Sequence, residues 1–243
     1  MTKNFLIPFE ADNYSDEIIL EYAGRLVDGI LVVSDLIFDT VEFERTSIEW
    51  NMKATSSPNT YSLFLHSLNS VYYLSYAFEI TNDTEYFDLA YSIVYSYIDY
   101  LCSNETKNAY TWYDQSAALR TENLIYFHSI YKKKIGTADE CLVDIIRKHA
   151  DWLMNDRNYC HRHNHGIYQD AALIKAGYIF NNVDYCNNAI KRLDSQLKYA
   201  FPNGFAHIEN SIIYNLYVLN YTLSLSNFLF NISIILALIV LLL

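Results

Sequence analysis

Turn-forming residues are scarce in this chain of 243 residues, which contains 6 glycines and 3 prolines. An all-β fold needs many tight turns, so this scarcity argues against one. The hydrophobic fraction of 52% is large enough to build a sizeable core. The length therefore allows one large domain or two small ones.

Cysteine pairs at metal-binding or redox spacing are also missing. The four cysteines are Cys102, Cys141, Cys160 and Cys186, and none of them forms a CxxC pair. This pattern gives no support to a zinc ribbon or a thioredoxin-type motif. The plainest interpretation is that the cysteines are small buried hydrophobic residues.

Positive charge is in short supply, with 17 Lys and Arg against 28 Asp and Glu and a net charge of −11. Binding of nucleic acid relies on an excess of positive charge, so the chain as a whole is not expected to bind nucleic acid. If the protein binds an acidic ligand, it must do so through a local basic patch.

The two ends of the chain differ in their apolar content. Residues 1–7 carry one lysine and a short apolar patch before a run of acidic residues, which does not resemble a secretory signal peptide. No charged residue occurs between Leu216 and Leu243. A membrane-spanning helix needs about 20 apolar residues. Residues 226–243 are therefore expected to be a membrane anchor or a truncated buried helix, which implies a cytoplasmic or membrane-associated protein.

Apolar residues recur every three or four positions along most of the chain, which is the helical pattern. It predicts eight or nine helices joined by short loops in antiparallel hairpins, an all-α fold. One expected helix starts near Asp16, the next is a single helix from Asn59 or Thr60 to Ile80, and another starts at Thr84. Further helices are expected over residues 116–131, from a Thr137 cap, over residues 169–180 and 183–197, and from Asn210. Residues 31–43 fit either a short strand pair or a continuing helix.

The densest group of chemically active side chains is the stretch 161–170, His-Arg-His-Asn-His-Gly-Ile-Tyr-Gln-Asp. It holds three of the seven histidines and precedes a predicted helix, so it is expected to be a site. Two other segments are unusually polar, 112–121 and 207–214. In the first, Trp112, Asp114 and Arg120 could line a cleft, or Asp114 could be a helix cap with Arg120 in an ordinary salt bridge.

Four segments carry a resemblance to a known family. Asn164-His165-Gly166, followed by Gln-Asp-Ala-Ala-Leu, resembles the Asn-His-Gly helix start of heparinase II/III-type polysaccharide lyases. The segment WYDQSAALRTENLIYF from Trp112 is similar to the family's Trp-(His)-Asp-x-x-x-Ala-x-Arg helix. PNGFAHIENSIIYN resembles its Asp-Gly-x-x-x-Glu-x-Ser-x-x-Tyr-His segment, and the stretch from Tyr61 resembles its early helical hairpin. The resemblance covers about residues 45–225, with the segments in the family's order.

The resemblance implies a function, because this family cleaves uronic-acid-containing polysaccharides by β-elimination. The uronate carboxylate is neutralised, a base removes the C5 proton, and an acid protonates the leaving C4 oxygen. By motif position, Asn164 and His165 would neutralise the carboxylate and Tyr214 would be the catalytic tyrosine. The expected substrate-binding residues are Arg120, Arg162, His163, Asp114, Trp112 and Glu209. This chemistry requires no cofactor and no metal, and the expected partner is an acidic polysaccharide.

The resemblance also implies an architecture, a partial α/α toroid of antiparallel hairpins over residues 46–225. Residues 1–45 would form an N-terminal segment and residues 226–243 an apolar tail. Two departures from the family pattern stand out. Asn215 follows Tyr214 where the family usually has histidine, and the family's C-terminal β-sandwich is expected to be missing. Inactivity through truncation is therefore one expected outcome, and the oligomeric state stays open.

Three alternatives remain open from the residues themselves. His161, His163 and His165 would share one face of a strand, and zinc would accept them with Asp170 or Cys160. A glycoside hydrolase on a helical toroid would need two carboxylates, for which Asp114 and Glu209 could serve. The third alternative is a non-catalytic protein, membrane-tethered or a remnant, that binds acidic glycan.

Overall fold

The computed structural model describes residues 4–34, 41–44, 48–202, 208 and 212–242, with the backbone alone for residues 12, 213, 214, 217 and 233–242. Within this part the regular structure is helical, apart from one antiparallel bridge between Ile30 and Glu42. The all-α prediction is confirmed. The α-helices are α1 (Asp16–Val27), α2 (Pro58–Ser67), α3 (Asn69–Thr81), α4 (Thr84–Cys102), α5 (Asp114–Ile135), α6 (Glu140–Met154), α7 (Asn164–Phe180), α8 (Val183–Ala200) and α9 (Ile212–Leu242), with short 3-10 helices at η1 (Phe9–Asn13), η2 (Ala109–Trp112) and η3 (Asp156–Asn158).

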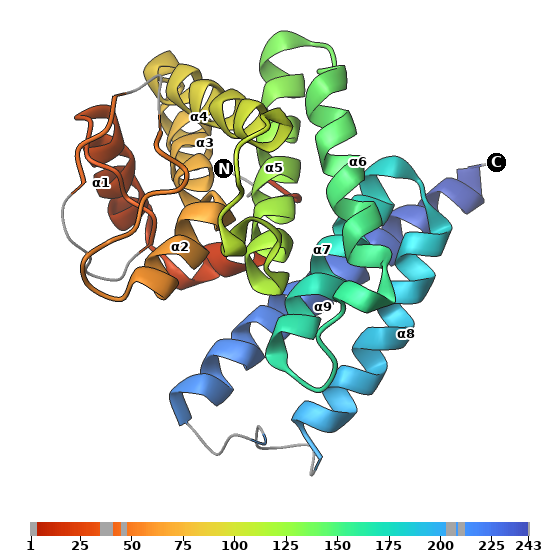
Figure 1. Ribbon diagram of the computed structural model, residues 1–243. Coiled ribbons are helices and arrows are strands. Elements are labelled where there is room, and N and C mark those ends of the chain that lie inside the picture. The colour runs from red at the N-terminus through yellow and green to blue at the C-terminus, as the bar shows by residue number, and fades with distance from the viewer. Residues whose placement is uncertain (1–3, 35–40, 45–47, 203–207, 209–211, 243) are drawn as a thin grey trace.

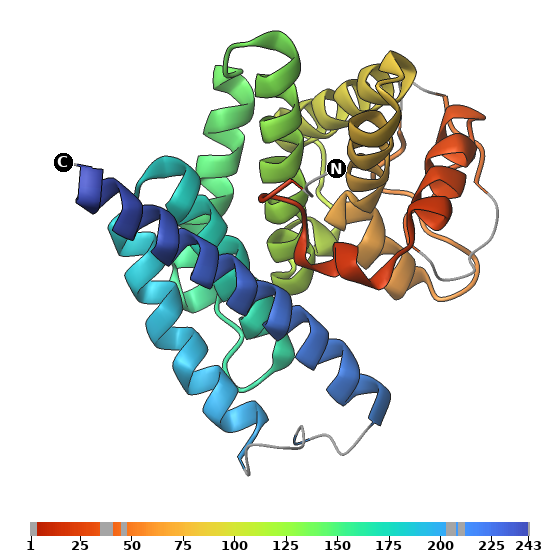
Figure 2. The same cartoon turned by 180° about the vertical axis from the view of Figure 1, so that it is seen from behind.

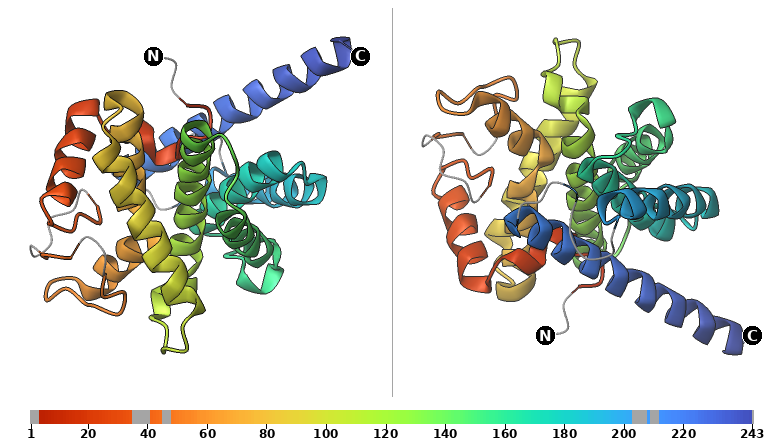
Figure 3. Two further views of the ribbon diagram at one scale, coloured as in Figure 1. Left: turned by 90° about the horizontal axis from the view of Figure 1, so that it is seen from above. Right: turned by 90° about the horizontal axis from the view of Figure 1, so that it is seen from below.

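Helix α5 is the centre of the molecule, because it packs against α2, α3, α6 and α7. Helices α1 to α4 lie on one side of it and α7 and α8 on the other (Figure 1). The views from above and below show the same division (Figure 3). Consecutive helices pair as α3 with α4, α5 with α6 and α7 with α8. These hairpins are the arrangement that the short predicted loops indicated.

Most helices begin where a polar side chain can accept a hydrogen bond from the first turn. Ser15 caps α1 by accepting from the amide of Ile18, and Asp83 caps α4 by accepting from the amide of Glu85. The prediction that Thr137 caps α6 is wrong. Asp139 is the cap and accepts from Leu142 N at 3.1 Å, and its carboxylate also interacts favourably with the positive end of the helix dipole.

The predicted single helix from residue 59 or 60 to residue 80 is also wrong, because the chain breaks at Leu68. This buried leucine has a left-handed φ of 58°, which separates α2 from α3. Side chains of α5 satisfy the carbonyls that the break releases: Asn123 Nδ2 donates to Ser67 O at 2.8 Å and Arg120 donates to His66 O. The break therefore depends on α5, and the apolar spacing of residues 59–80 does not show it.

A buried ion pair joins the two ends of the chain to the central helices. Lys175 of α7 is fully buried and donates to Glu122 Oε2 of α5 at 2.8 Å. The same carboxyl group accepts from Phe9 N at 3.0 Å and from the Tyr221 hydroxyl of α9. Burial, together with the Glu122 carboxylate, raises the pKa of Tyr221 well above its ordinary value, so this phenol keeps its proton.

Helix α9 crosses the face that is turned away from the viewer in Figure 1 and that Figure 2 shows. It contacts α7 and η1. Val218, Tyr221, Leu225 and Phe228 lie on its buried side, within the hydrophobic core. Among the residues that the structure describes, no helix combines the length and apolar character needed to cross a membrane.

Candidate active site

The histidine stretch forms the turn that leads into α7, as the sequence predicted. Arg162 adopts a left-handed φ of 55° within the turn that precedes α7. His163 is the N-cap residue, and its Nδ1 accepts from the amide of His165 at 3.3 Å. Asn164, His165 and Gly166 then make the first turn of α7, where the helix dipole is positive.

Asp114 brings the second predicted segment to this turn. Its Oδ1 lies 3.0 Å from His165 Nδ1, which joins the first residue of α5 to the first turn of α7. Burial on its own would raise the pKa of Asp114, but the hydrogen bond and charge of His165, with a hydrogen bond to Cys160, lower it below its ordinary value. Asp114 is therefore ionised at neutral pH and orients the His165 ring.

Two tyrosines outside the predicted site residues also lie beside His165. The Tyr113 ring is 5.8 Å from the His165 ring, and the Tyr168 ring is 6.4 Å from it, between ring centroids. Tyr113 is 36% exposed, and burial together with Asp114 raises its pKa, so it can offer a ligand a hydroxyl donor. Its position between Trp112 and Asp114, in a segment already selected, was the signal that could have found it.

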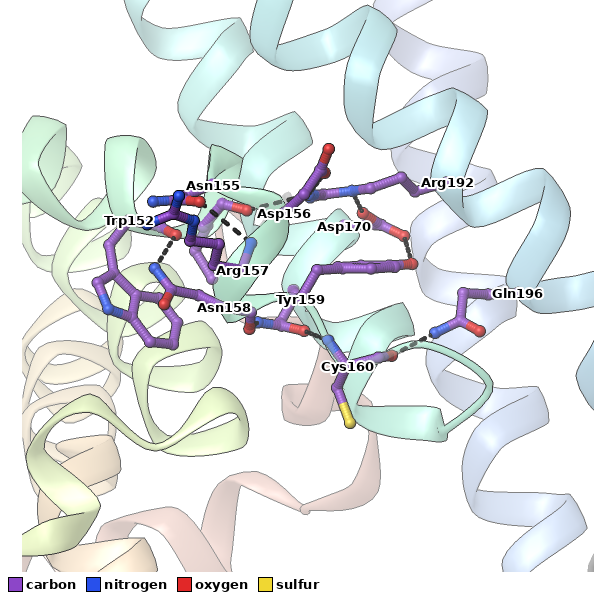
Figure 4. Close-up of polar contacts among 12 residues, drawn as sticks. Trp152, Asn155, Asp156, Arg157, Asn158, Tyr159, Cys160, Asp170, Arg192 and Gln196 are labelled. Atoms are coloured by element: carbon purple, nitrogen blue, oxygen red, sulfur yellow. Dashed lines mark hydrogen bonds and ion pairs between the residues drawn. The ribbon is translucent and has the colours of Figure 1, made fainter.

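An ion pair behind the loop fixes its start, as Figure 4 shows. The Tyr159 hydroxyl donates to Asp170 Oδ2 at 2.7 Å, and Arg192 Nε donates to Asp170 Oδ1 at 2.8 Å. Burial raises the pKa of Asp170 to about 7, although Arg192 and Tyr159 both favour the carboxylate. Asp170 is thus committed to holding α8 and the loop against α7.

Two buried glutamines hold the rest of the loop. Gln169 Oε1 accepts from Cys160 N at 2.8 Å, and Gln196 Nε2 donates to Cys160 O at 2.7 Å. A Cβ on Gly166 would lie 1.8 Å from Gln196 Nε2 and 2.5 Å from Cys160 O. Only glycine fits at that position, which gives the Asn-His-Gly motif a steric explanation.

Arg120 lies inside the protein rather than on the site's surface. It is 0% exposed, and it donates to His149 Nε2 at 2.8 Å and to Thr111 O at 2.6 Å. Its guanidinium also lies 5.5 Å from the centre of the Trp112 ring, which packs on His149 at 4.9 Å. In this structure the side chains of Arg120 and Trp112 support the loop before α5, and their roles in substrate binding stay predictions.

The remaining predicted residues differ in how far they can be placed. Asn164 is buried in the first turn of α7, whereas Arg162 and His163 are exposed beside it. Glu209 lies outside the described residues. Tyr214 has a described backbone position in α9, but its side chain is also outside them. The roles of these residues stay predictions.

One group of side chains could hold a metal ion. Single ligand atoms of Cys160, His163 and His165 lie within 4.8 Å of one another. His161 and Asp170, which the sequence also offered as ligands, are engaged elsewhere: the His161 ring packs on Tyr159 and Asp170 pairs with Arg192. Burial and the nearby Asp114 raise the pKa of the Cys160 thiol to about 12.

Comparison with known protein families decides the relationship. The model of the heparinase II/III N-terminus matches residues 9–231. The chain belongs to the heparinase II/III family. The family resemblance inferred from the sequence is thereby confirmed. A search of curated proteins found no match.

Solved structures of this family share the fold. The heparan sulfate lyase HepC from Pedobacter heparinus superposes with a TM-score of 0.69 and 16% identity over 89% of this chain. A mutant of HepC superposes with a TM-score of 0.68 and 17% identity over 90% of this chain. A heparinase III with methylated lysines superposes with a TM-score of 0.67 and 13% identity, over 93% of this chain. The matches cover 35% of the two HepC chains and 39% of the heparinase III chain, so this chain corresponds to little more than a third of those proteins.

Proposed function

We propose that this heparinase II/III-family chain acts on a uronic-acid-containing acidic polysaccharide by β-elimination, and that the first turn of α7 holds the uronate carboxylate. The observation that carries the proposal is the 3.0 Å contact between His165 Nδ1 and Asp114 Oδ1. It joins the two motifs at one surface and fixes the orientation of the histidine. The names of the solved relatives, heparan sulfate lyase and heparinase, support an acidic polysaccharide as substrate.

The chemistry requires that charge on the uronate carboxylate be neutralised before the C5 proton can leave. The amide of Asn164 and the imidazole of His165 would bind the carboxylate at the positive end of the α7 dipole. The exposed Arg162 and His163 add positive or hydrogen-bonding groups beside it. This local basic patch would let a chain with a net charge of −11 accept an acidic polymer.

Elimination then proceeds through a base and an acid. The base takes the C5 proton, the released electron pair forms the C4–C5 double bond, and the C4–oxygen bond breaks as the acid protonates the leaving oxygen. We assign the tyrosine of this step to Tyr214 from its motif position. A tyrosine with an ordinary pKa of about 10 needs positive neighbours before it can act as a base. Tyr113, with its raised pKa, suits a hydrogen bond to the sugar instead.

The proposal is tested by binding native heparan sulfate and the same polymer with its carboxyl groups reduced to alcohols. Wild-type protein is expected to prefer the native polymer. The His165→Ala variant should lose about tenfold or more of its affinity for native polymer, because a hydrogen bond to a charged group is worth about 1.5–3 kcal/mol. Its affinity for the reduced polymer should not change.

His161→Ala is the matched control, since His161 is exposed in the same loop and belongs to neither motif. This variant is expected to bind both polymers as the wild type does. If His165→Ala keeps the full preference for native polymer, the carboxylate site has been assigned to the wrong residues. Equal binding of the two polymers by wild-type protein would contradict carboxylate recognition altogether.

A further inference from the structure

A cysteine and two histidines meet in the loop that precedes α7. One ligand atom from each of Cys160, His163 and His165 lies within 4.8 Å of the other two, and the two imidazole ring centroids are 4.2 Å apart. Thiolate and imidazole are the ligands that Zn²⁺ and similar divalent transition metals prefer. We propose that these three side chains form a binding site for one such ion, represented by Zn²⁺.

Asp114 gives this group the surroundings of an organised metal site. A metal-bound histidine commonly donates its second ring N–H to a carboxylate, which fixes the tautomer and the ring orientation. His165 Nδ1 lies 3.0 Å from Asp114 Oδ1, which leaves Nε2 with its lone pair for a metal. Asp114 also lies close enough to the Cys160 thiol to raise its pKa. The Asp114 carboxylate therefore orients one of the three ligands and lies beside a second.

The backbone of the loop is held in place independently of any ion. Gln169 and Gln196, which are 0% and 4% exposed, bind both the N–H and the carbonyl of Cys160. Gln196 also accepts from Arg162 N at 2.8 Å and donates to His163 O at 3.0 Å. These contacts hold the backbone of Cys160 and His163 in place, so the two ligands are already close together before an ion binds.

The remaining adjustment is small. In a tetrahedral zinc site with Zn–S of about 2.3 Å and Zn–N of about 2.0 Å, ligand atoms are roughly 3.3–3.8 Å apart. The limit of 4.8 Å in this structure therefore asks for a closure of about 1 Å. The exposed His163 side chain can supply that movement by a rotation about its own bonds.

The site shares His165 with the proposed carboxylate site, and this consequence rests on the proposed function. A metal ion at Nε2 would occupy the nitrogen that would otherwise face the uronate. Zn²⁺ and the uronate polymer are therefore expected to compete, and Zn²⁺ should weaken binding of the native polymer.

The metal site is tested first without any polysaccharide, by titrating the protein with Co²⁺ as a spectroscopic substitute for Zn²⁺. Wild-type protein should show the visible bands of tetrahedral cobalt and an ultraviolet thiolate-to-cobalt band, saturating at one equivalent and reversed by Zn²⁺. Cys160→Ser should lose the thiolate band. The His163→Asn variant should bind Co²⁺ at least tenfold more weakly than wild type. Asparagine keeps a side chain that can cap α7, so the loss would come from the missing imidazole. His161→Ala should behave as the wild type.

Saturation at one equivalent with these variant effects supports the site. Absence of the thiolate band in folded wild-type protein, or equal binding of Co²⁺ by wild type, Cys160→Ser and His163→Asn, would overturn it.

Competition is then measured with native heparan sulfate and Zn²⁺. Loss of polymer binding on addition of Zn²⁺ in wild type, with retention in Cys160→Ser, supports the shared use of His165. If Zn²⁺ binds but polymer affinity is unchanged, shared use is contradicted and the metal site stands. The result with Co²⁺ alone does not depend on the proposed lyase function.

Discussion

Gly166 shows most clearly, at the scale of single residues, how the site depends on steric fit. Its missing Cβ makes room for Gln196 Nε2 and Cys160 O. We expect Gly166→Ala to destabilise the protein by about 1–3 kcal/mol, as overpacking in a core does, and to weaken binding of native heparan sulfate. Urea denaturation and a binding isotherm on the same sample measure both effects.

Gly24 in α1 offers a matched control for this substitution. Beyond the backbone of its own helix and its two chain neighbours, no atom lies within 4 Å of where a Cβ on Gly24 would be. Gly24→Ala should therefore stabilise the protein by about 0.5–1 kcal/mol and leave polymer binding unchanged. A Gly166→Ala variant as stable as wild type would show that the loop can move aside at little cost.

The sequence was a good guide to single residues where local chemistry decides the outcome. The Asn-His-Gly turn at a helix start and the helix starts near residues 16 and 84 follow from neighbouring residues alone. Arg120 was less predictable, because its position inside the protein depends on carbonyls and a histidine from other helices. The approach of Cys160 to His165 depends likewise on two glutamines that act from α7 and α8.

The buried pair of Lys175 and Glu122 is the feature that matters most at the scale of elements. Lys175→Met would leave the Glu122 carboxylate buried without a counter-charge, which typically costs about 3–5 kcal/mol. Urea denaturation should show this loss, and the double variant with Glu122→Gln should recover part of it. The substitution should loosen η1 and α9 in particular, since both donate to Glu122.

The exposed pair of Lys198 and Asp194 is the control for that measurement. Its 2.7 Å contact is as short as the buried one, but both side chains are largely exposed. Lys198→Met should therefore change stability by no more than about 1 kcal/mol. A similar loss for both lysines would mean that burial does not decide the energy of these pairs.

The pattern of apolar residues predicted the number and pairing of most elements, because each hairpin buries its own face. It missed the break at Leu68, where α2 and α3 meet. That break is stabilised by Asn123 from α5, and no property of residues 59–80 records it. The spacing of apolar residues within one segment therefore does not predict a helix boundary that depends on contacts with another helix.

Two buried histidines predict how stability of the whole molecule depends on pH. Burial, with the positive charge of Arg120, lowers the pKa of His66 to about 3 and that of His149 well below its ordinary value of 6.5. As pH falls below 6.5, the unfolded chain gains protons that the folded state excludes, so stability falls from there towards pH 3. Each histidine should cost about 2 kcal/mol between pH 7 and pH 5.

His149→Gln is the variant that tests this account, because it removes the titrating ring and keeps polar groups facing Arg120. Urea denaturation at the two pH values should show about 2 kcal/mol less acid destabilisation than in wild type. An unchanged difference would mean that carboxyl groups, and not the buried histidines, set the acid limit.

The ultraviolet absorbance of an unsaturated uronate tests the central claim most directly. Purified protein would be incubated with heparan sulfate, alginate and other uronate polymers while the C4–C5 double bond is followed. We expect a rise with at least one polymer, abolished by His165→Ala and by Tyr214→Phe and retained by Tyr95→Phe, whose hydroxyl binds Asp139 away from the site. No rise from folded wild-type protein on any polymer, or full activity in the His165→Ala variant, would contradict the account.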